Sequence, residues 1–389
     1  MWDKGLHLIL ILLLFIYLFG FIWGIPYLIF SVFLFDTIAP MFGYQRITDF
    51  NLAVLYLSEE YNSNISLYMQ IDKIDFESFE RTVYQRTISA ILRMRQVPVR
   101  YFGLYLWKEV DIDIARQQVK KEDKHFDDHA SFLEYFQQIS NQKMDMTKPL
   151  FEFRLIEDYT EDTSMIIFIC DHTFCDGVSC ASLLSTLNDD QFSIPNKKAQ
   201  HKFSIVEKLI LAAKTFFTFS EIEKKAKTYK TDKNTKGLLK QVRNDNIRTG
   251  YYESDIEIPF EVVRKYYKTY DGMTFNDFML ALIGKSLHEH CNKKGISNPQ
   301  SLRFELPVNH KRLPTGYHDV NICDYLTIVD LELPIVDSIK QGYKTFKPWL
   351  SHILKPDTQK QLINFMHMIP YVPKSYMMSE IKASSEGSD

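Results

Sequence analysis

His172 lies in a segment whose residue types are suited to proton transfer. Residues 171–177 have the sequence DHTFCDG and follow directly on the apolar run 165–170. Imidazole has an unperturbed pKa near neutrality, so its neutral form can accept a proton from a hydroxyl group. A buried strand would hold such a ring firmly, while the turn after it would leave the ring open to a cleft. These properties make His172 a candidate general base.

Two residues at the end of this segment are expected to shape the turn. Asp176 could order the turn itself or pair with a cation such as Arg154. Gly177 would permit a backbone angle or a close approach that a Cβ atom would block. The pattern has little specificity alone, because a histidine at a strand end can simply satisfy a hydrogen bond.

Three of the five cysteines, Cys170, Cys175 and Cys180, surround the same histidine. They are five residues apart, whereas zinc sites have the C-x2-C spacing, so no metal site is predicted. The five cysteines are too few and too irregular for a disulfide framework. Buried, reduced thiols indicate a catalytic domain on the cytosolic side.

The elements that position the turn follow from hydrophobic periodicity. A continuous apolar run predicts a buried strand at 165–170. Thr274 occupies an N-cap position with Asp277 three residues later, which predicts a capping box at the start of a long helix. The other patterns predict strands at 66–71, 151–156, 254–258, 302–308 and 325–333 and helices at 76–92, 132–139, 178–187 and 274–291.

This irregular alternation favours layered α/β sandwiches over a doubly wound nucleotide fold. The sequence contains neither common type of glycine-rich phosphate loop. A hydrophobic content of 46% with 24% charged residues excludes a disordered chain. The net charge of -3 gives no reason to expect a nucleic-acid partner.

The N-terminal segment predicts attachment to a bilayer. The run from Leu8 to Phe35 contains no charged residue, and about 20 apolar residues are enough for a helix to cross a membrane. Gly20, Gly24 and Pro26 interrupt the run, so residues 1–40 could form one tilted span or a hairpin. The flanking charges are too few to fix an orientation.

The remaining chain is expected to form two domains, 44–195 and 251–389, with a crossover linker at 196–250. This linker is rich in lysine, yet apolar residues recur in it at helical intervals. A basic amphipathic helix of this kind can lie on a membrane surface or pack against its own protein.

Several motifs together resemble a known acyltransferase family. Residues 172–177 match the H-x-x-x-D-G core of the HHxxxDG signature, which is shared by relatives of chloramphenicol acetyltransferase and by condensation domains. Pro149-Leu150-Phe151 resembles the Pro-Leu-Trp motif of the bifunctional wax ester synthase/acyl-CoA:diacylglycerol acyltransferase family. Residues 274–277 (TFND) resemble the Asn-Asp motif of this family, and 306–309 (LPVN) with Val320-Asn321 are similar to its later segments.

The resemblance implies a fold and a set of roles. It implies an α/β (α+β) fold, the chloramphenicol acetyltransferase-like two-domain sandwich. It implies that His172 deprotonates an acceptor alcohol, whose alkoxide attacks the acyl-CoA thioester directly without any cofactor. Asp176 would hold the motif in shape. Asn276 and Asp277, at a helix N-terminus, would stabilise an oxyanion or position substrate, or would simply cap the helix.

The sequence departs from the family at three places. Asp171 replaces the first histidine of the signature, and Phe151 replaces the tryptophan. The sequence ends at Asp389, soon after residues 371–373, without the later segment that the family carries. The second domain is therefore expected to be incomplete.

The leading hypothesis is transfer of a long acyl chain from acyl-CoA to diacylglycerol or a long-chain fatty alcohol. The product would be triacylglycerol or wax ester, made at the endoplasmic reticulum or plasma membrane. One alternative is an inactive, membrane-bound lipid-binding or scaffold protein that retains the fold. Another is acyl transfer from a carrier protein, although no carrier domain or serine attachment motif is visible.

Overall fold

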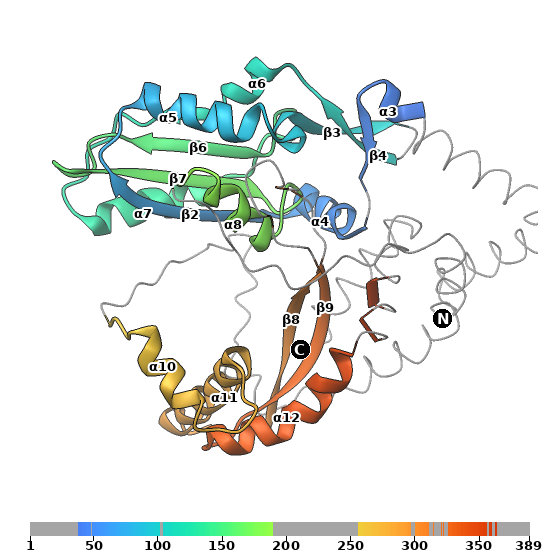
Figure 1. The fold of residues 1–389 in the computed structure, drawn as a ribbon, viewed down its shortest axis with the longest axis vertical. Helices are drawn as coiled ribbons and strands as arrows, with labels where there is room; N and C mark the ends of the chain where they lie inside the picture. The colour runs from blue at the N-terminus through green and yellow to red at the C-terminus, as the bar shows by residue number, and fades with distance from the viewer. Residues whose placement is uncertain are drawn as a thin grey trace, which may run out of the picture. The chain divides into compact units, whose positions relative to one another are not determined.

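The computed structural model describes two parts of the chain, each with short gaps (Figure 1). Two compact units are distinguished, Met1–Lys197 with Arg312–Asp324 and Ile369–Glu380, and Lys198–Lys311 with Tyr325–Met368 and Ile381–Asp389. They are called unit 1 and unit 2, and each is considered by itself. The described residues are 38–47, 49–101, 104–189, 256–296, 300–310, 314, 320, 322, 326–355, 358–359 and 362–363.

Three predicted features lie largely outside these ranges. They are the membrane anchor, of which residues 1–37 are not described, the linker at 196–250, and the C-terminal residues 364–389. Among the described residues, no helix combines the length and the apolar character needed to cross a bilayer.

The main sheet of unit 1 has four strands in the order β2-β7-β6-β5. Strand β7 runs antiparallel to both of its neighbours, and β5 runs parallel to β6. Every residue of β7 after its first is buried, as its continuous apolar sequence requires. The strands are β2 (Asn64–Asp72), β5 (Val119–Lys121), β6 (Phe151–Ile156) and β7 (Thr163–Asp171).

Helices α5 (Phe76–Val83) and α7 (His129–Ser140) cover opposite faces of this sheet (Figure 1). The ring of Phe79 on α5 lies 6.2 Å from that of Phe153 on β6. The ring of Tyr68 on β2 lies 4.9 Å from that of Phe136 on α7. Since side chains alternate across a strand, the strand register places Phe153 and Tyr68 on different faces.

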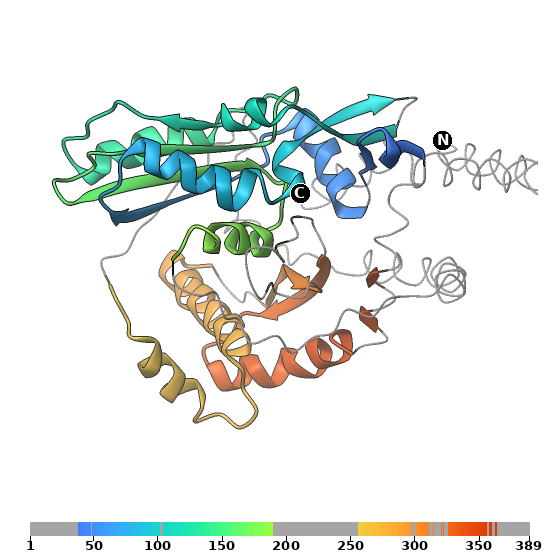
Figure 2. The ribbon, with the colours of Figure 1, turned by 45° about the horizontal axis from the view of Figure 1, so that its top comes forward.

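A second sheet of unit 1 has three strands in the order β1-β4-β3. Helix α4 leads into β2, and helix α8 follows the turn that contains His172. Figure 2 shows α4 in blue and α8 in green. The elements of unit 1 outside the main sheet and its two covering helices are α3 (Ala39–Met41), β1 (Tyr44–Arg46), α4 (Asp49–Glu60), η3 (Tyr84–Ile88), η4 (Leu92–Arg95), β3 (Gln96–Tyr101), β4 (Leu104–Glu109), α6 (Ile112–Arg116) and α8 (Gly177–Ser185).

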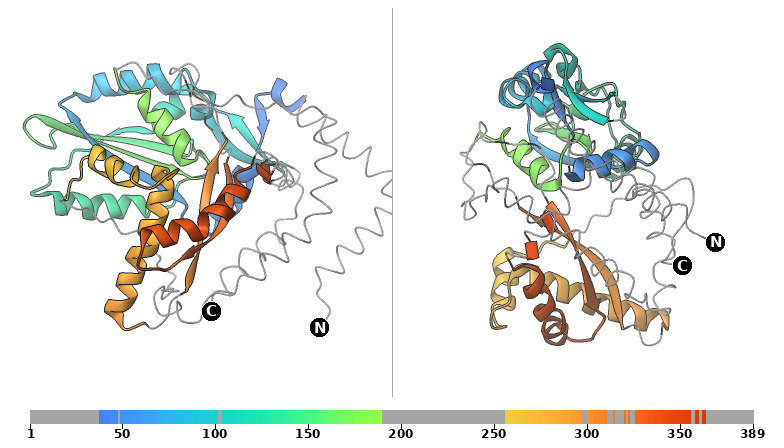
Figure 3. Two further views of the ribbon diagram at one scale, coloured as in Figure 1. Left: turned by 60° about the horizontal axis from the view of Figure 1, so that its bottom comes forward. Right: turned by 90° about the vertical axis from the view of Figure 1, so that its right-hand side faces the viewer.

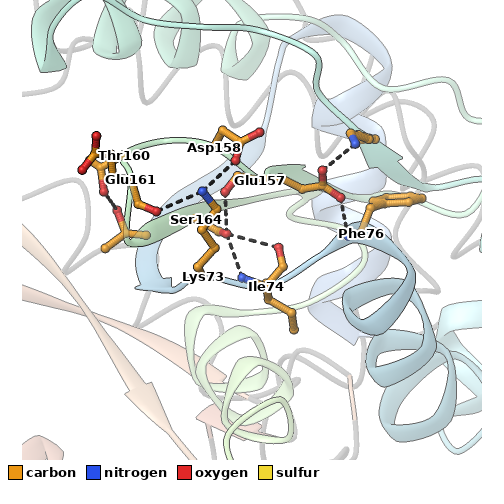
Figure 4. Close-up of polar contacts among 10 residues, drawn as sticks. Lys73, Ile74, Phe76, Glu157, Asp158, Thr160, Glu161 and Ser164 are labelled. Atoms are coloured by element: carbon orange, nitrogen blue, oxygen red, sulfur yellow. Dashed lines mark hydrogen bonds and ion pairs between the residues drawn. The ribbon is translucent and has the colours of Figure 1, made fainter.

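Polar contacts fasten β7 at the end opposite His172 (Figure 4). The buried hydroxyl of Ser164 donates to the carbonyl oxygen of Glu157 at 2.7 Å and accepts from the backbone N–H of Ile74 at 3.0 Å. Close by, Lys73 Nζ lies 2.8 Å from Asp158 Oδ1. These contacts join β2, β6 and β7, so the start of the histidine-bearing strand is fixed in place.

Unit 2 contains an antiparallel hairpin of β8 (Ser301–Asn309) and β9 (Leu326–Pro334) with helices packed against it (Figure 3). Leu331 and Leu333 of β9 enter a core shared with helices α10 (Phe260–Tyr267), α11 (Phe275–Lys294) and α12 (Ile339–Ile353). Gly284 allows α11 to approach β9 closely, because a Cβ atom there would overlap the carbonyl oxygen of Pro334.

Most predicted elements are confirmed. The strands predicted at 66–71, 151–156, 165–170, 302–308 and 325–333 correspond to β2, β6, β7, β8 and β9. The helices predicted at 132–139, 178–187 and 274–291 correspond to α7, α8 and α11.

Two predictions were wrong in part. Residues 256–258 of the predicted strand are irregular, because Pro259 starts helix α10 directly after them. The helix predicted at 76–92 ends its α-helical part at Val83 and continues as one π-helical turn, η3.

Candidate active site

His172 is the one partly exposed residue in an otherwise buried stretch. Every other residue from 164 to 176 is buried. Because β7 lies between β2 and β6, the backbone that carries His172 is supported on both sides. The backbone N–H of His172 donates to the carbonyl oxygen of Ser63 at 2.9 Å. The fold therefore presents this imidazole at the end of a rigid strand.

The turn after β7 is tied together by hydrogen bonds. The backbone N–H of Phe174 donates to the Asp171 carbonyl at 2.8 Å. The N–H of Thr173 donates to Asp171 Oδ1 at 2.7 Å. From helix α4, Asn51 Nδ2 donates to the Thr173 carbonyl at 2.8 Å. The backbone on both sides of His172 is thus held by defined partners.

Asp176 orders the turn, which was one of the two arrangements expected for it. Its Oδ1 accepts from the backbone N–H of Ser179 at 2.7 Å, so Asp176 is the N-cap of α8. The expected pairing with Arg154 is wrong. The Arg154 guanidinium instead contacts Glu122 at 2.6 Å and also pairs with Glu152.

Gly177 was expected to allow a backbone angle or a close approach that a Cβ atom would block, and this expectation is also wrong. Gly177 is the first residue of α8, and its backbone does not have the positive φ seen at Gly43, Gly272 and Gly295. A Cβ atom on Gly177 would meet no atom within 4 Å. Among the described residues, no steric or conformational reason requires glycine at this position.

The motif Pro149-Leu150-Phe151 supports the histidine turn from β6. The Leu150 carbonyl accepts from the backbone N–H of Asp171 at 3.1 Å. Phe151 pairs with Cys170 across the strands, and its ring lies 5.6 Å from that of Phe174. Both Leu150 and Phe151 are completely buried. Residues 149–151 therefore support the turn through one backbone hydrogen bond and through aromatic packing.

The cysteines around His172 form a buried thiol cluster. Cys170 Sγ lies 3.4 Å from Cys175 Sγ, and Cys170, Cys175 and Cys180 are all free. Burial raises the pKa of the Cys170 and Cys175 thiols, while hydrogen bonds from these two thiols lower the pKa of Cys180. Among the described residues, no three His, Cys, Asp or Glu side chains are arranged so that they could hold a metal ion.

Asn276 and Asp277 lie in unit 2, in the first turn of α11. Thr274 and Asp277 form the predicted capping box. The Asp277 carboxylate is 2% exposed, and its Oδ2 also lies 2.7 Å from Lys347 Nζ of α12. This carboxylate is therefore occupied by a helix cap and an ion pair, whereas the adjacent Asn276 is exposed.

Of the other matched segments, residues 306–309 form the end of β8 in unit 2. Asn321 lies outside the described residues.

The sequence did not predict three polar residues that contact the histidine turn. Asn51 and Ser58 belong to α4, and Ser63 belongs to the loop that joins α4 to β2. All three bond to the backbone or side chains of residues 171–173. A signal for two of them exists, because Asn51 and Ser58 lie two turns apart on helix α4 and all six residues between them are apolar.

Comparison of the sequence with protein families gives one match at the site. Residues 108–212 match the sequence model for alcohol acetyltransferase. The match spans less than half of the chain, but it includes β6, β7 and the turn with His172. None of the curated proteins matches the sequence.

Solved structures with a similar fold include a trichothecene 15-O-acetyltransferase from Fusarium sporotrichioides. It has a TM-score of 0.54 and 11% identity, with 87% of this chain and 76% of that chain covered. The epimerization domain of tyrocidine synthetase B has a TM-score of 0.52 and 13% identity, with coverages of 83% and 76%.

The first condensation domain of the calcium-dependent antibiotic synthetase is also similar. It has a TM-score of 0.51 and 12% identity, with coverages of 80% and 75%. At these identities the comparison establishes the fold, which is the mixed α/β fold of condensation domains and acetyltransferases.

Proposed function

We propose that this chain is an O-acyltransferase in which His172 is the general base. The observation that carries the proposal is the placement of His172 as the one partly exposed residue between residues 164 and 176. The match of residues 108–212 to the alcohol acetyltransferase model supports acyl transfer to a hydroxyl group. The shared fold is compatible with both transfer to alcohols and transfer to other acceptors.

In the proposed reaction, the neutral imidazole of His172 removes the proton from an acceptor hydroxyl as its oxygen attacks the thioester carbon of acyl-CoA. A new C–O bond forms and a tetrahedral intermediate results. The C–S bond then breaks, and the departing thiolate takes the proton from the imidazolium as free CoA forms. General base catalysis of this kind contributes about 10²–10⁴-fold to the rate.

The proposed role of Asp176 is to keep this geometry. As the N-cap of α8, it fixes the point at which the turn becomes a helix, and it is 2% exposed. Replacing an N-cap aspartate by alanine costs about 0.5–2 kcal/mol. Asn276, exposed at the start of α11, is proposed to position substrate through its side-chain amide.

The proposed acceptors are diacylglycerol and long-chain fatty alcohols, and the proposed site of action is the cytosolic face of the endoplasmic reticulum or plasma membrane. The support is the uncharged run Leu8–Phe35, which is long enough to hold the chain at a bilayer where such acceptors reside. The free, buried cysteines support a reducing compartment.

A second candidate reaction is transfer of an acetyl group to an alcohol. The description of the matching family, alcohol acetyltransferase, favours this reaction specifically. The two candidates use the same base and differ in the length of the acyl chain that is transferred.

A matrix of donors and acceptors tests the function. Membranes that carry the full chain would receive radiolabelled acetyl-CoA or palmitoyl-CoA with a short branched alcohol, hexadecanol or diacylglycerol. We expect ester from palmitoyl-CoA with hexadecanol or diacylglycerol. Ester from acetyl-CoA and the short alcohol alone would support the second candidate. Absence of ester with every pair would contradict acyl transfer and favour an inactive lipid-binding protein.

A further inference from the structure

The carboxylate of Asp171 is buried next to the proposed base, and a set of neutral donors surrounds it. Asp171 is 2% exposed. Its Oδ1 accepts from Ser58 Oγ at 2.9 Å and from the Thr173 N–H at 2.7 Å. Its Oδ2 accepts from Ser63 Oγ at 2.9 Å. Among the described residues, no cation pairs with this carboxylate. A buried carboxylate is costly unless hydrogen bonds replace its lost hydration.

The two serines also reach the residues that follow Asp171. The Ser63 carbonyl accepts from the backbone N–H of His172 at 2.9 Å. The Ser58 hydroxyl can accept from Thr173 Oγ1, which lies 3.2 Å away, and it also lies close to the Ser63 hydroxyl. Residues 171, 172 and 173 are therefore each bonded to Ser58, Ser63 or both.

This contact joins segments that are far apart in the sequence. Ser58 belongs to the last turn of α4, and Ser63 to the loop before β2. Asn51, two turns earlier on α4, holds the Thr173 carbonyl at 2.8 Å. Helix α4 and the loop after it thus hold the histidine turn from outside the segment 171–177. We call Ser58, Ser63 and Asp171 the serine–aspartate clamp.

We infer that Ser58 and Ser63 are positioning residues for His172, acting through Asp171 and the backbone of the turn. The inference rests on the proposed role of His172 as a base. Proton transfer requires the imidazole nitrogen and the hydroxyl to approach within about 2.6–3.2 Å. A misplacement of about 1 Å can lower the rate about 100-fold. The clamp limits such displacement because its bonds converge on the residues on either side of the imidazole.

The inference also explains a departure from the HHxxxDG signature. Asp171 occupies the position of the first histidine, and β7 ends there. A carboxylate at this position can accept from several donors at once. The chain supplies those donors as two hydroxyl groups and one backbone N–H. The buried aspartate therefore depends on the hydrogen bonds that the two serines donate to it.

The test compares the double variant Ser58→Ala/Ser63→Ala with wild type. The control variant is Ser89→Ala. Ser89 is an exposed serine of the same unit whose hydroxyl donates to the Gln85 carbonyl at 2.9 Å. We expect kcat of the double variant to fall about 10- to 100-fold, with the KM values for donor and acceptor nearly unchanged. Ser63→Thr restores a hydroxyl and should recover most of the kcat lost in Ser63→Ala.

A second readout does not depend on turnover. Diethyl pyrocarbonate modifies histidine rings, and mass spectrometry reports the rate at each position. Release of the turn should raise the rate at His172 severalfold, with the rate at exposed His125 unchanged. A purely structural role would lower the melting temperature but leave both the native-state kcat and the His172 labelling rate unaltered.

The outcomes separate the two proposals. If wild type forms ester and the double variant has unchanged kcat and unchanged His172 labelling, the clamp inference is overturned while the function stands. If wild type forms no ester, the proposed function fails. The labelling rates then still decide whether Ser58 and Ser63 position His172.

Discussion

The ion pair between Asp277 and Lys347 gives a prediction that decides what Asp277 does. The structure commits its carboxylate to the capping box of α11 and to Lys347 of α12, at 2.7 Å. We predict that Lys347→Met destabilises unit 2, because it leaves a carboxylate that is 2% exposed without its cation. We predict further that Asp277→Asn removes most of this penalty when it is combined with Lys347→Met.

The magnitude follows from the unequal burial of the two partners. Breaking a fully buried ion pair by removing one partner costs about 3–5 kcal/mol, whereas an exposed pair contributes about 0–1 kcal/mol. The side chain of Lys347 is 31% exposed and that of Asp277 is 2% exposed. We therefore expect Lys347→Met to cost about 1–3 kcal/mol, between these limits. The coupling between the two substitutions should be about 1–2 kcal/mol.

The assay is chemical unfolding followed by circular dichroism, for wild type, both single variants and the double variant. Lys344→Met is the matched control, since Lys344 is an exposed lysine on the same helix. It should change the free energy of unfolding by less than about 0.5 kcal/mol. Equal effects of Lys347→Met and Lys344→Met, or additive effects of Lys347→Met and Asp277→Asn, would refute the reasoning. Ester formation that is lost in a stable double variant would instead assign Asp277 to the substrate.

Two further predictions concern the packing of unit 2 and the stability of unit 1 at alkaline pH. Gly284→Ala should lower the melting temperature, because overlap with the Pro334 carbonyl costs about 1–3 kcal/mol and outweighs a helix-propensity gain of about 1 kcal/mol; a higher melting temperature would contradict this. Burial, then a hydrogen bond with Glu122, raises the pKa of Tyr135, so the folded chain holds this proton more tightly than the unfolded chain does. The associated stability is complete below the ordinary tyrosine pKa of about 10 and is lost as the pH rises above it toward the folded value. Tyr135→Phe should therefore make the loss of unfolding free energy between about pH 9 and pH 11 smaller, and an unchanged loss would contradict the assignment.

The central strand and the helix starts were predictable because local sequence determines them. The apolar run before His172 allows burial on both faces and little else, and it forms β7. The capping box of Thr274 and Asp277 is a contact over three residues, so its sequence pattern predicts its structure directly. The same applies to Asp176, whose cap contact with Ser179 is also local.

The partners of Asp171 were not predictable, because they depend on long-range packing. Ser58 and Ser63 precede Asp171 by more than 100 residues, and only the pairing of β2 with β7 brings them to it. The expected contact between Asp176 and Arg154 failed for a related reason. Arg154 faces α7 from β6 and finds Glu122 after β5, an arrangement that only the strand order reveals.

The role of Gly177 illustrates a different limit. Glycine at a turn suggests a left-handed backbone or a close approach, but either feature must be seen in the fold. Gly177 has neither and instead opens a helix. Residue type alone therefore predicted a constraint that the local geometry does not impose.

The most direct test of the central claim is the rate of ester formation in His172→Ala relative to wild type. The control is His125→Ala, which alters an exposed histidine of the same unit. With expression and melting temperature matched, His172→Ala should form ester about 10²–10⁴-fold more slowly, because it removes the general base. His125→Ala should match wild type. Ester formation by His172→Ala at the wild-type rate would contradict the assignment of His172 as the base.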